Sequence, residues 1–442
     1  MRITRFIIAL TVFSSFTIVK LHAQVGENLP TEWTLQDCLT YAKAHNISIN
    51  SLRLNEKSAE QDLLQAKASK LPSLSGSVSQ GIESLSVNNS QLQLRSNFSN
   101  NIGVSSSVVL YNSGYINNNI KSKDLSVKSA NLSVSEAENN ISINIAEAYL
   151  NILMVQENIV YLQNLLSTTK SQLAQAENQY KFGSIAKKDY LQFQSQVAND
   201  EYNLVNAQNQ LRSDIVNLKQ ILQLPSDFDF QIVKSLDVNV GDVDLALKDA
   251  QQKAQASRPE IENSQLGVEI AETELKKSKA NGLPVLSAGG GINTSFADHQ
   301  GTGVITQWGD NFYQSVGLSL SIPIYNQRLY KTAVEKAKIN IEQAQLTKLN
   351  TETVLNQEVE QAYINLENSI AQYKAAAVQY NINKETYDIS TAELKLGNIN
   401  LVALQQQRSL YIQALQAYIQ AKYSAVLNQK IYEFYTGQSL TL

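Results

Sequence analysis

The side chains of this sequence that could act as nucleophiles or metal ligands are few. Cys38 is the only cysteine, and the histidines outside the first 23 residues are His45 and His299. A Cys–His nucleophile pair would need Cys38 beside one of these histidines. Residues 38 and 45 are two helical turns apart, but a lone cysteine on an amphipathic stretch more often packs in a core. We therefore predict no catalytic site, no metal centre and no cofactor, and the glycine run 289–291 lacks the helix and lysine of a phosphate-binding loop.

Two isolated glycines interrupt stretches that otherwise have the pattern of long helices. Gly183 and Gly397 each stand far from any other glycine in the sequence. Glycine adopts the left-handed backbone conformation of a tight turn at no steric cost. We therefore expect each glycine to mark a tip, where one helix reverses into the next. The charged residues at these tips are Lys181, Lys187, Lys188 and Asp189 beside Gly183, and Lys395 beside Gly397.

The elements that must position these tips are long helices. No proline occurs from 73 to 224 or from 324 to 442, and a proline inside a helix costs about 3 kcal/mol or more. From Ile141 to Leu166 and from Val359 to Tyr380, apolar and aromatic residues recur at alternating spacings of three and four. This is the heptad pattern of helices packed side by side. A helix from about residue 115 to 180 would be roughly 100 Å long at 1.5 Å per residue, far longer than a globular domain.

The chain repeats itself at an offset of 212 to 214 residues. Leu71-Pro72 recurs as Leu283-Pro284, and the tip glycine Gly183 recurs as Gly397. Each copy has the pattern of a short helix, two strands, a long helix, a glycine and another long helix. We predict a signal peptide at 1–23, followed by two repeats. The first repeat spans 24–240, with strands at about 72–82 and 98–111 and a tip near 183. The second repeat spans 241–442, with strands at about 284–297 and 312–324 and a tip near 397.

The predicted strands alternate between an apolar face and a small, uncharged polar face. A soluble sheet with one wet face would alternate in the same way. The strand lengths, the lack of charge and the export signal favour a membrane barrel with lipid outside and water inside. The residues predicted to face lipid are Leu286, Ile292, Phe296, Val316, Leu318, Leu320 and Ile322. Aromatic residues near the strand ends, predicted to form an interfacial girdle, are Tyr111, Tyr115, Trp308, Phe312, Tyr313 and Tyr325.

Four strands are too few to close a membrane barrel, because the smallest such barrels have eight. An open sheet edge is not tolerated in lipid. Several copies of the chain must therefore share one barrel, which predicts a homo-oligomer in contact with membrane lipid. The predicted fold class is mainly α with a transmembrane β part: long antiparallel coiled-coil helices, four strands per chain and two internal repeats.

The N-terminal segment is expected to direct export. Arg2 and Arg5 precede an apolar run from Phe6 to Phe16, and Ala23 ends the segment as a small residue suited to cleavage. The chain carries 36 basic and 40 acidic residues. The leading segment holds only basic ones, so the mature chain is more acidic than the whole. This balance argues against nucleic acid as a partner.

With these features together, the sequence resembles the TolC family of outer-membrane efflux channels over nearly all of its mature length. The stretch from Thr34 to Asn46 is similar to the family's opening helix, and Arg258-Pro259-Glu260 resembles the element that starts its second repeat. The glycine tips, with Asp189 six residues after Gly183, resemble the family's tip motif.

The resemblance implies a homotrimer whose twelve strands form one outer-membrane barrel and whose helices form a tunnel, an α-barrel, through the periplasm. It implies that the narrow helical end docks onto a periplasmic adaptor (a membrane fusion protein) joined to an inner-membrane transporter. The protein would then be the passive export channel of a tripartite efflux or type I secretion system and not an enzyme. The charged residues and glycines of the two tips would be its docking residues.

The sequence departs from the family pattern at the tips. The position of Asp189 is taken in the second repeat by Ala403, with Gln406 three residues on, which puts a gate of carboxylate rings in doubt. Ser184 and Asn398 follow the glycines where the family often has leucine, so the adaptor is expected to differ accordingly.

Two points stay open at the level of sequence. A periplasmic coiled-coil scaffold or adaptor without a membrane barrel is the alternative interpretation, and it predicts a protein that is soluble without detergent. A polar, uncharged lumen is compatible with many exported substrates. The linker at about 226–255 is expected to belong to a small collar of mixed structure around the helices.

Overall fold

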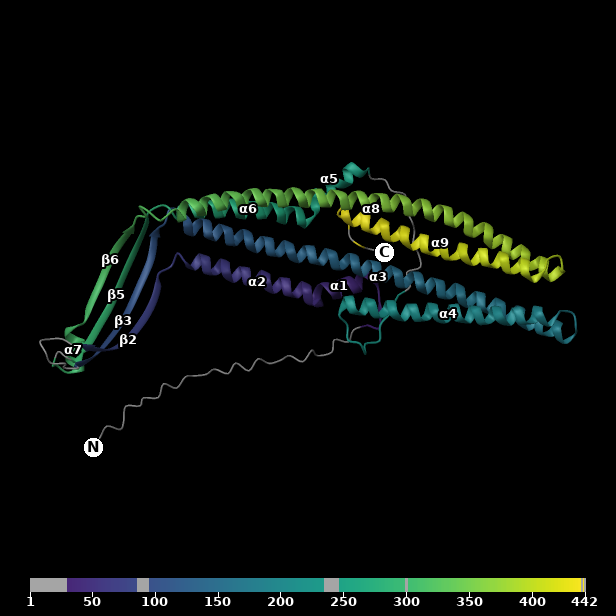
Figure 1. Cartoon of the computed structure of the whole chain (residues 1–442), viewed down its shortest axis with the longest axis horizontal. Coiled ribbons are helices and arrows are strands. Elements are labelled where there is room, and N and C mark those ends of the chain that lie inside the picture. Colours follow the sequence, from purple (N-terminus) through teal and green to yellow (C-terminus); the bar gives the residue numbers. More distant parts are fainter. Residues whose placement is uncertain (1–29, 86–94, 234–245, 299–300, 439, 441–442) are drawn as a thin grey trace, which may run out of the picture.

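The computed structural model describes residues 30–85, 95–233, 246–298, 301–438 and 440. These residues form an elongated molecule (Figure 1), in which a four-stranded sheet occupies one end and two helical hairpins occupy the other. The predicted signal peptide at 1–23 lies outside the described residues, as does His299.

The two halves of the chain have the same order of elements. The first half contains β1 (Glu32–Trp33), α1 (Leu35–His45), α2 (Ile47–Ala68), β2 (Ser73–Leu85), β3 (Arg95–Tyr111), α3 (Tyr115–Lys181), α4 (Lys187–Leu222) and β4 (Gln231–Ile232). The second contains α5 (Leu247–Ser257), α6 (Pro259–Ala280), β5 (Val285–Ala297), α7 (Val304–Asp310), β6 (Tyr313–Ser321), α8 (Leu329–Leu396) and α9 (Leu401–Tyr435). The repeat of short helix, two strands, long helix and long helix is therefore confirmed.

The long helices α3 and α8 span 67 and 68 residues, and the expected helix at about 115–180 is confirmed. Each is preceded by two residues in the left-handed region, Ser113 and Gly114 before α3 and Gln327 and Arg328 before α8. The chain therefore turns in the same way from strand to helix in both repeats, although only one of these four residues is a glycine.

The helices lie side by side in one layer (Figure 1). Near the sheet, α3 packs against α2 and α6, and α6 packs against α8. Toward the tips, α3 packs against α4 and α9, and α9 packs against α8. The helix order is thus α2–α3–α6–α8 near the sheet and α4–α3–α9–α8 near the tips, which leaves α2, α4 and α8 at the edges of the layer.

The predicted heptad positions form the seams between these helices. Ile145, Ile152 and Ile159 of α3 are buried, as are Val359 and Leu366 of α8. Tyrosines occupy seam positions between α8 and α9 and stack on one another. The stacked pairs are Tyr373–Tyr418 at 5.7 Å between ring centroids, Tyr380–Tyr418 at 5.0 Å, Tyr380–Tyr411 at 6.1 Å and Tyr387–Tyr411 at 5.3 Å.

A collar packs on one face of the layer midway along the helices. It consists of α1 and the two-stranded parallel sheet of β1 and β4. Trp33 lies at its centre, with its ring 5.1 Å from that of Tyr41 and 5.6 Å from that of Phe230. The Tyr149 hydroxyl of α3 donates a hydrogen bond to the Val233 carbonyl at 2.9 Å and so ties the collar to the layer. The described part of the linker at 226–255 contains β4 and part of α5, in agreement with the expected mixed structure.

The strands pair in the order β2–β3–β5–β6, with every pair antiparallel. The predicted strands are all present, and β2 and β5 each span 13 residues, within the expected 11 to 14, but the other two differ. β3 spans 17 residues, whereas β6 spans only 9 and ends at Ser321. Pro323, which has no backbone N–H to donate, follows that end closely.

The short helix α7 between β5 and β6 was not anticipated from the sequence. It is fastened to β5 by Gln307, whose amide exchanges hydrogen bonds with the backbone N–H and carbonyl of Ala297 at 2.9 and 3.0 Å. The same amide donates to the Thr302 carbonyl at 2.8 Å. Gln307 is 2% exposed. Two further hydrogen bonds fasten the connection to β5, from the Thr294 hydroxyl to the Trp308 carbonyl at 2.7 Å and from the Asn311 amide to the Ser295 carbonyl at 2.8 Å.

Among the helices of the described segments, none combines the length and the hydropathy needed to cross a bilayer.

Candidate functional site

One face of the sheet is lined by small, uncharged residues from all four strands. Across it, Ser75 pairs with Ser105, Ser105 with Gly291, and Gly291 with Ser315. The Ser75 and Ser105 hydroxyls are 2.9 Å apart, and Ser73 and Ser107 form an equivalent pair at 3.0 Å. These two pairs of hydroxyls therefore satisfy one another, and the residues paired across this part of the face are small and uncharged.

The opposite face carries the residues predicted to face lipid. Leu286 pairs with Leu320, Ala288 with Leu318, and Gly290 with Val316. Leu286, Ile292 and Phe296 alternate along β5, and Val316, Leu318 and Leu320 alternate along β6, so these six residues share one face. Ile322 lies just beyond the end of β6. Val316 is 94% exposed and Leu318 is 71% exposed in the single chain.

The aromatic residues predicted as a girdle lie at both ends of the strands. Tyr111 and Tyr115 lie near the strand–helix junction of the first repeat, and Tyr325 lies near that of the second. At the other end, Phe312 precedes β6 and Trp308 belongs to α7, not to a strand. A bulge between Val109 and Tyr111 places Tyr111 opposite Leu286 and thus on the apolar face.

Tyr313 does not share a face with the predicted lipid-facing residues. It pairs with Asn293, on the small polar face that also holds Ser315. Because successive residues of a strand point to opposite faces, a role for Tyr313 in a lipid-facing girdle does not fit this register. The Tyr313 side chain lies on the polar face, at the beginning of β6.

Gly183 and Gly397 have the predicted left-handed conformation, with φ of 72° and 77°. The turns that they make are alike. The N–H of Ser184 donates to the Gln179 carbonyl at 2.8 Å, and that of Asn398 donates to the Glu393 carbonyl at 2.9 Å. These bonds satisfy carbonyls left open at the ends of α3 and α8. The glycines are therefore needed for backbone geometry, since a Cβ at either position would meet no atom within 4 Å.

The two tips differ in charge. Lys181, Lys187 and Lys188 are exposed at the first tip, where Lys181 pairs with Glu177 at 2.7 Å. At the second tip, α9 begins with Leu401 and is capped by Asn400, whose side chain accepts from the N–H of Ala403 at 2.9 Å. Basic residues therefore dominate only the first tip.

Sequence reasoning missed two apolar side chains at the tips. Phe182 is 86% exposed and Leu396 is 75% exposed, and each stands directly before a tip glycine. The sequence could have indicated them, because a large apolar residue directly precedes the tip glycine in both repeats. Exposed apolar residues beside a turn are suited to contact a partner.

The structure brings three of the predicted tip residues together. Asp189, Lys395 and Gly397 line a groove of about 330 Å³ between the hairpins α3/α4 and α8/α9, which we name the tip groove. Its apolar lining includes Ala176, Phe193, Leu394 and Leu401. Lys181, Gly183, Lys187 and Lys188 do not line it. The tip groove combines an apolar floor with one acid and one base at its rim.

A buried ion pair joins the two hairpins behind the tip groove. Arg408 of α9 donates to the Asp200 carboxylate of α4 at 2.5 Å and to the Thr169 hydroxyl of α3 at 3.2 Å. The side chains of Arg408 and Asp200 are 3% and 2% exposed. Sequence reasoning missed this pair, although each residue stands at a heptad position, Arg408 between Leu404 and Tyr411 and Asp200 between Val197 and Leu204.

Of the residues considered for nucleophilic chemistry, Cys38 and His45 are described, and they do not form a reactive pair. Burial and the neighbouring Asp37 raise the pKa of the Cys38 thiol to about 12, so it stays protonated. Cys38 is fully buried in the core beneath the collar, as predicted for a packing residue. His45 places Nδ1 3.1 Å from the Tyr41 carbonyl oxygen and stacks on the Tyr41 ring. Within the described residues, no three His, Cys, Asp or Glu side chains are grouped to hold a metal ion.

Comparison with known proteins identifies the family. The sequence profile of the outer membrane efflux proteins matches residues 39–223 and 250–431, one stretch in each repeat. The chain therefore belongs to the outer membrane efflux protein family.

Within this family, the chain is 25% identical over 285 residues to the outer membrane protein TolC of Escherichia coli. The alignment covers 61% of this chain and 55% of TolC, so the chain spans about half the length of that relative. Its fold matches the CmeC outer membrane channel of Campylobacter jejuni with a TM-score of 0.77, at 18% identity, over 92% of this chain and 87% of CmeC. It also matches the outer membrane protein VceC of Vibrio cholerae with a TM-score of 0.76, at 14% identity, over 92% of this chain and 97% of VceC.

Proposed function

We propose that the protein is the outer-membrane channel of a tripartite efflux or type I secretion system, and that it conducts substrates passively from an inner-membrane pump to the outside. The observation that carries this proposal is the sheet, which is apolar on one face, small and uncharged on the other, and continuous with long helices. A sheet closed around its polar face would present the apolar face to lipid and enclose a water-filled lumen.

Closure requires further copies of the chain. β2 and β6 each have one unpaired edge, and an unpaired edge is not tolerated in lipid. The edge of β2 can pair with the edge of β6 of the next copy, so that the contacts run head to tail around a ring. Three chains would then close a twelve-stranded barrel, the homotrimer that the family resemblance implies.

The helices offer matching surfaces for the same ring. On α2, which forms one edge of the layer, Ile47 and Leu54 are 70% and 65% exposed and lie one heptad apart. On α8, which forms the other edge, Ile339 and Leu346 are 59% and 67% exposed at the same spacing. Such stripes suit knobs-into-holes packing with a neighbouring helix, and a ring brings α2 of one copy against α8 of the next.

The function is tested by the ion conductance of the purified oligomer in planar lipid bilayers. Insertion should give stepwise current increases of uniform size, because each step would be one aqueous pore. Outer-membrane extracts from cells that lack the protein, purified in the same way, serve as the control. Absence of any steps, together with release of the protein as a soluble species by osmotic shock, would favour a periplasmic scaffold instead.

We further propose that the tips dock onto a periplasmic adaptor that connects the channel to an inner-membrane transporter. The tip groove supports this proposal because it offers an apolar floor with Asp189 and Lys395 at its rim. Lys187, Lys188 and Phe182 are exposed beside it and add basic and apolar contacts. This composition suits a short helical turn of a partner that carries both apolar and charged residues.

A photo-crosslinker at residue 188 should capture this adaptor in intact cells. The exposed side chain at the beginning of α4 points away from the packed seam, so its replacement is expected to leave the fold unchanged. The same crosslinker at Glu60, which is exposed in the single chain on α2 and lies far from the tips, is the matched control. Mass spectrometry should identify an adaptor only from position 188, and equal capture from both positions would contradict docking at the tip.

A further inference from the structure

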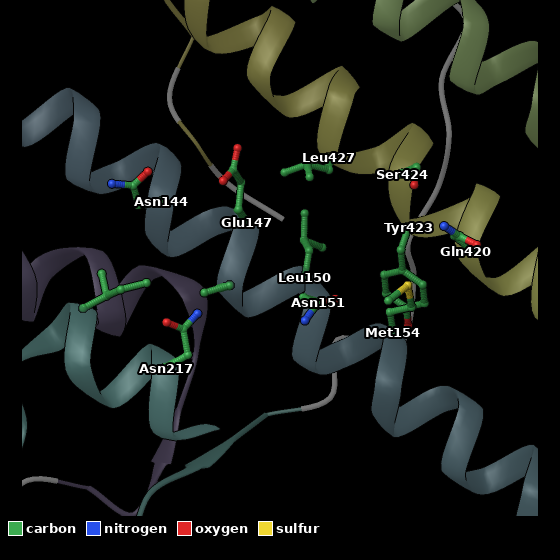
Figure 2. Close-up of a pocket in the computed structure, with 12 residues that line it drawn as sticks. Asn144, Glu147, Leu150, Asn151, Met154, Asn217, Gln420, Tyr423, Ser424 and Leu427 are labelled. Atoms are coloured by element: carbon green, nitrogen blue, oxygen red, sulfur yellow. The ribbon is translucent and has the colours of Figure 1, made fainter. Parts of the chain in front are cut away.

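A second groove is lined by residues 144–154 of α3, well before the tip at Gly183, and by residues 217–221 and 420–427 (Figure 2). It has a volume of about 560 Å³ and is lined by α3, by the end of α4 and by α9. Figure 2 shows the side chains of these three helices converging on it. We name it the mid-helix groove. Cavities of ~300–1,000 Å³ accommodate drug-sized molecules, so a small organic ligand would fit.

The mid-helix groove opens on the face of the layer opposite the collar. Glu147 and Asn151 line it from α3, and each is two residues from Tyr149, whose hydroxyl bonds to the collar. Two residues of an α-helix are about 200° apart around the axis. The side chains at 147 and 151 therefore point away from the collar, into the bare face.

The bare face is the one that lines the tunnel under the proposed function. A collar that lay inside a ring of helices would fill the passage, so the ring must close with the collar outside. The groove also lies within one chain, between α4 and α9, and not at the edge where a neighbouring copy packs. Its residues would thus meet the passing substrate, with one groove in each copy.

The lining has one acidic residue and no basic ones. Glu147 is exposed, and no described residue forms an ion pair with it. Lys422 of α9 is next in sequence to Tyr423 of the lining, but it forms an ion pair with Glu157 at 2.9 Å. Burial and the same Glu157 raise the pKa of Tyr423, so that its hydroxyl stays protonated and donates to that carboxylate at 2.7 Å. The Glu147 carboxylate is left to interact with a ligand.

The remainder of the lining is uncharged and consists of apolar, amide and hydroxyl side chains, the last from Tyr423 and Ser424. Leu150 and Met154 of α3, Ile221 of α4 and Leu427 of α9 supply aliphatic surface. Asn144, Asn151, Asn217 and Gln420 supply side-chain amides that can donate or accept. An apolar floor beside a single unpaired carboxylate is complementary to a molecule with a bulky apolar body and one positive charge.

We propose that the mid-helix groove is a binding site for amphipathic organic cations on their way through the tunnel. The inference rests on the proposed function for its setting in the lumen, and on the side chains of the groove for its ligand class. It differs from the tip groove, whose rim carries both an acid and a base. The site would hold a cation briefly, because an exposed carboxylate contributes only a weak ion pair.

The test measures binding of tetraphenylphosphonium, a rigid hydrophobic cation, to the purified protein in nanodiscs of zwitterionic lipid by titration calorimetry, with empty nanodiscs subtracted. Triphenylphosphine oxide, which is neutral, is the matched probe. Glu147→Gln should weaken binding of the cation by about three- to fivefold, the most that one exposed ion pair contributes. Binding of the neutral probe should change little, and Glu60→Gln on α2 should leave both unchanged.

Leu427→Trp provides a second variant that fills the groove and should weaken binding of both probes. Circular dichroism checks its fold, and Glu147→Gln carries the test if Leu427→Trp does not fold. Cation binding that is absent in the wild type, or that is equal in wild type and Glu147→Gln, would overturn the proposal. Conductance of the same preparation separates the two proposals. A protein that conducts ions but does not bind the cation refutes only the binding site in the mid-helix groove. A protein that binds the cation but does not conduct ions refutes the channel function.

Discussion

Replacement of Arg408 by alanine is expected to lower the free energy of unfolding by about 3–5 kcal/mol, the cost of leaving one charge of a buried ion pair without its partner. The Asp200 carboxylate, only 2% exposed, would either remain as a buried charge without a partner or have to take up a proton. The Thr169 hydroxyl would also lose the hydrogen bond that Arg408 donates to it. The three residues belong to α3, α4 and α9. The loss should therefore loosen the contact between the two hairpins and not one helix alone. Urea unfolding followed by circular dichroism in detergent measures the change.

Two controls separate the buried pair from ionic contacts in general. Lys170 and Glu201 form a pair at 2.8 Å on the same hairpin, but their side chains are 54% and 50% exposed. Lys170→Ala should cost no more than about 1 kcal/mol. The double variant Arg408→Met with Asp200→Leu removes both charges and should recover most of the lost stability. A cost for Arg408→Ala equal to that of Lys170→Ala would show that the buried pair does not join the hairpins.

Leu318→Arg is expected to prevent stable assembly in the outer membrane. Leu318 is 71% exposed on the apolar face of β6 in the single chain, near the middle of the strand. An arginine on the lipid face of a barrel costs about 2–4 kcal/mol at the bilayer midplane, and a ring repeats this cost in every copy. The measurement is the amount of heat-modifiable oligomer in the outer-membrane fraction, relative to total protein.

Ser319→Arg is the matched control, since residue 319 is the next position along the same strand and lies on the small polar face opposite Ser287. A side chain there would enter the aqueous lumen, so assembly should be close to that of the wild type. If the two substitutions reduced assembly equally, the assignment of the apolar face to lipid would be wrong.

The long-range layout of this protein can be predicted from its sequence because it depends on repeated local patterns. The absence of proline and the heptad spacing predict α3 to within one or two residues of its ends, and they predict a second long helix where α8 lies. The alternation of small and apolar residues fixes the two faces of β5 and β6. The isolated positions of Gly183 and Gly397 identify the turns, because few other residues adopt a left-handed conformation without cost.

The features that could not be predicted depend on contacts between distant elements. Nothing local shows that Arg408 reaches Asp200, since the pair forms only when three helices from both repeats have the correct register. The face occupied by Tyr313 follows from its pairing with Asn293, and that of Tyr111 follows from a bulge in β3. The mid-helix groove likewise exists only where α4 ends beside α3 and α9.

The position of Asp189 bears on how the narrow end of the tunnel is constricted. In the structure this carboxylate lines the tip groove together with Lys395, and the matching position of the second repeat is Ala403. Only one of the two tips therefore offers an acid at this place.

Three chains are proposed to join their sheet edges and form one membrane barrel. Native mass spectrometry of the protein extracted from outer membranes in mild detergent tests this proposal most directly, because the number of chains in the particle is read from its mass. We expect a single species with three copies of the mature chain, and therefore twelve strands. A monomer, or an assembly recovered from the periplasm without detergent, would contradict it.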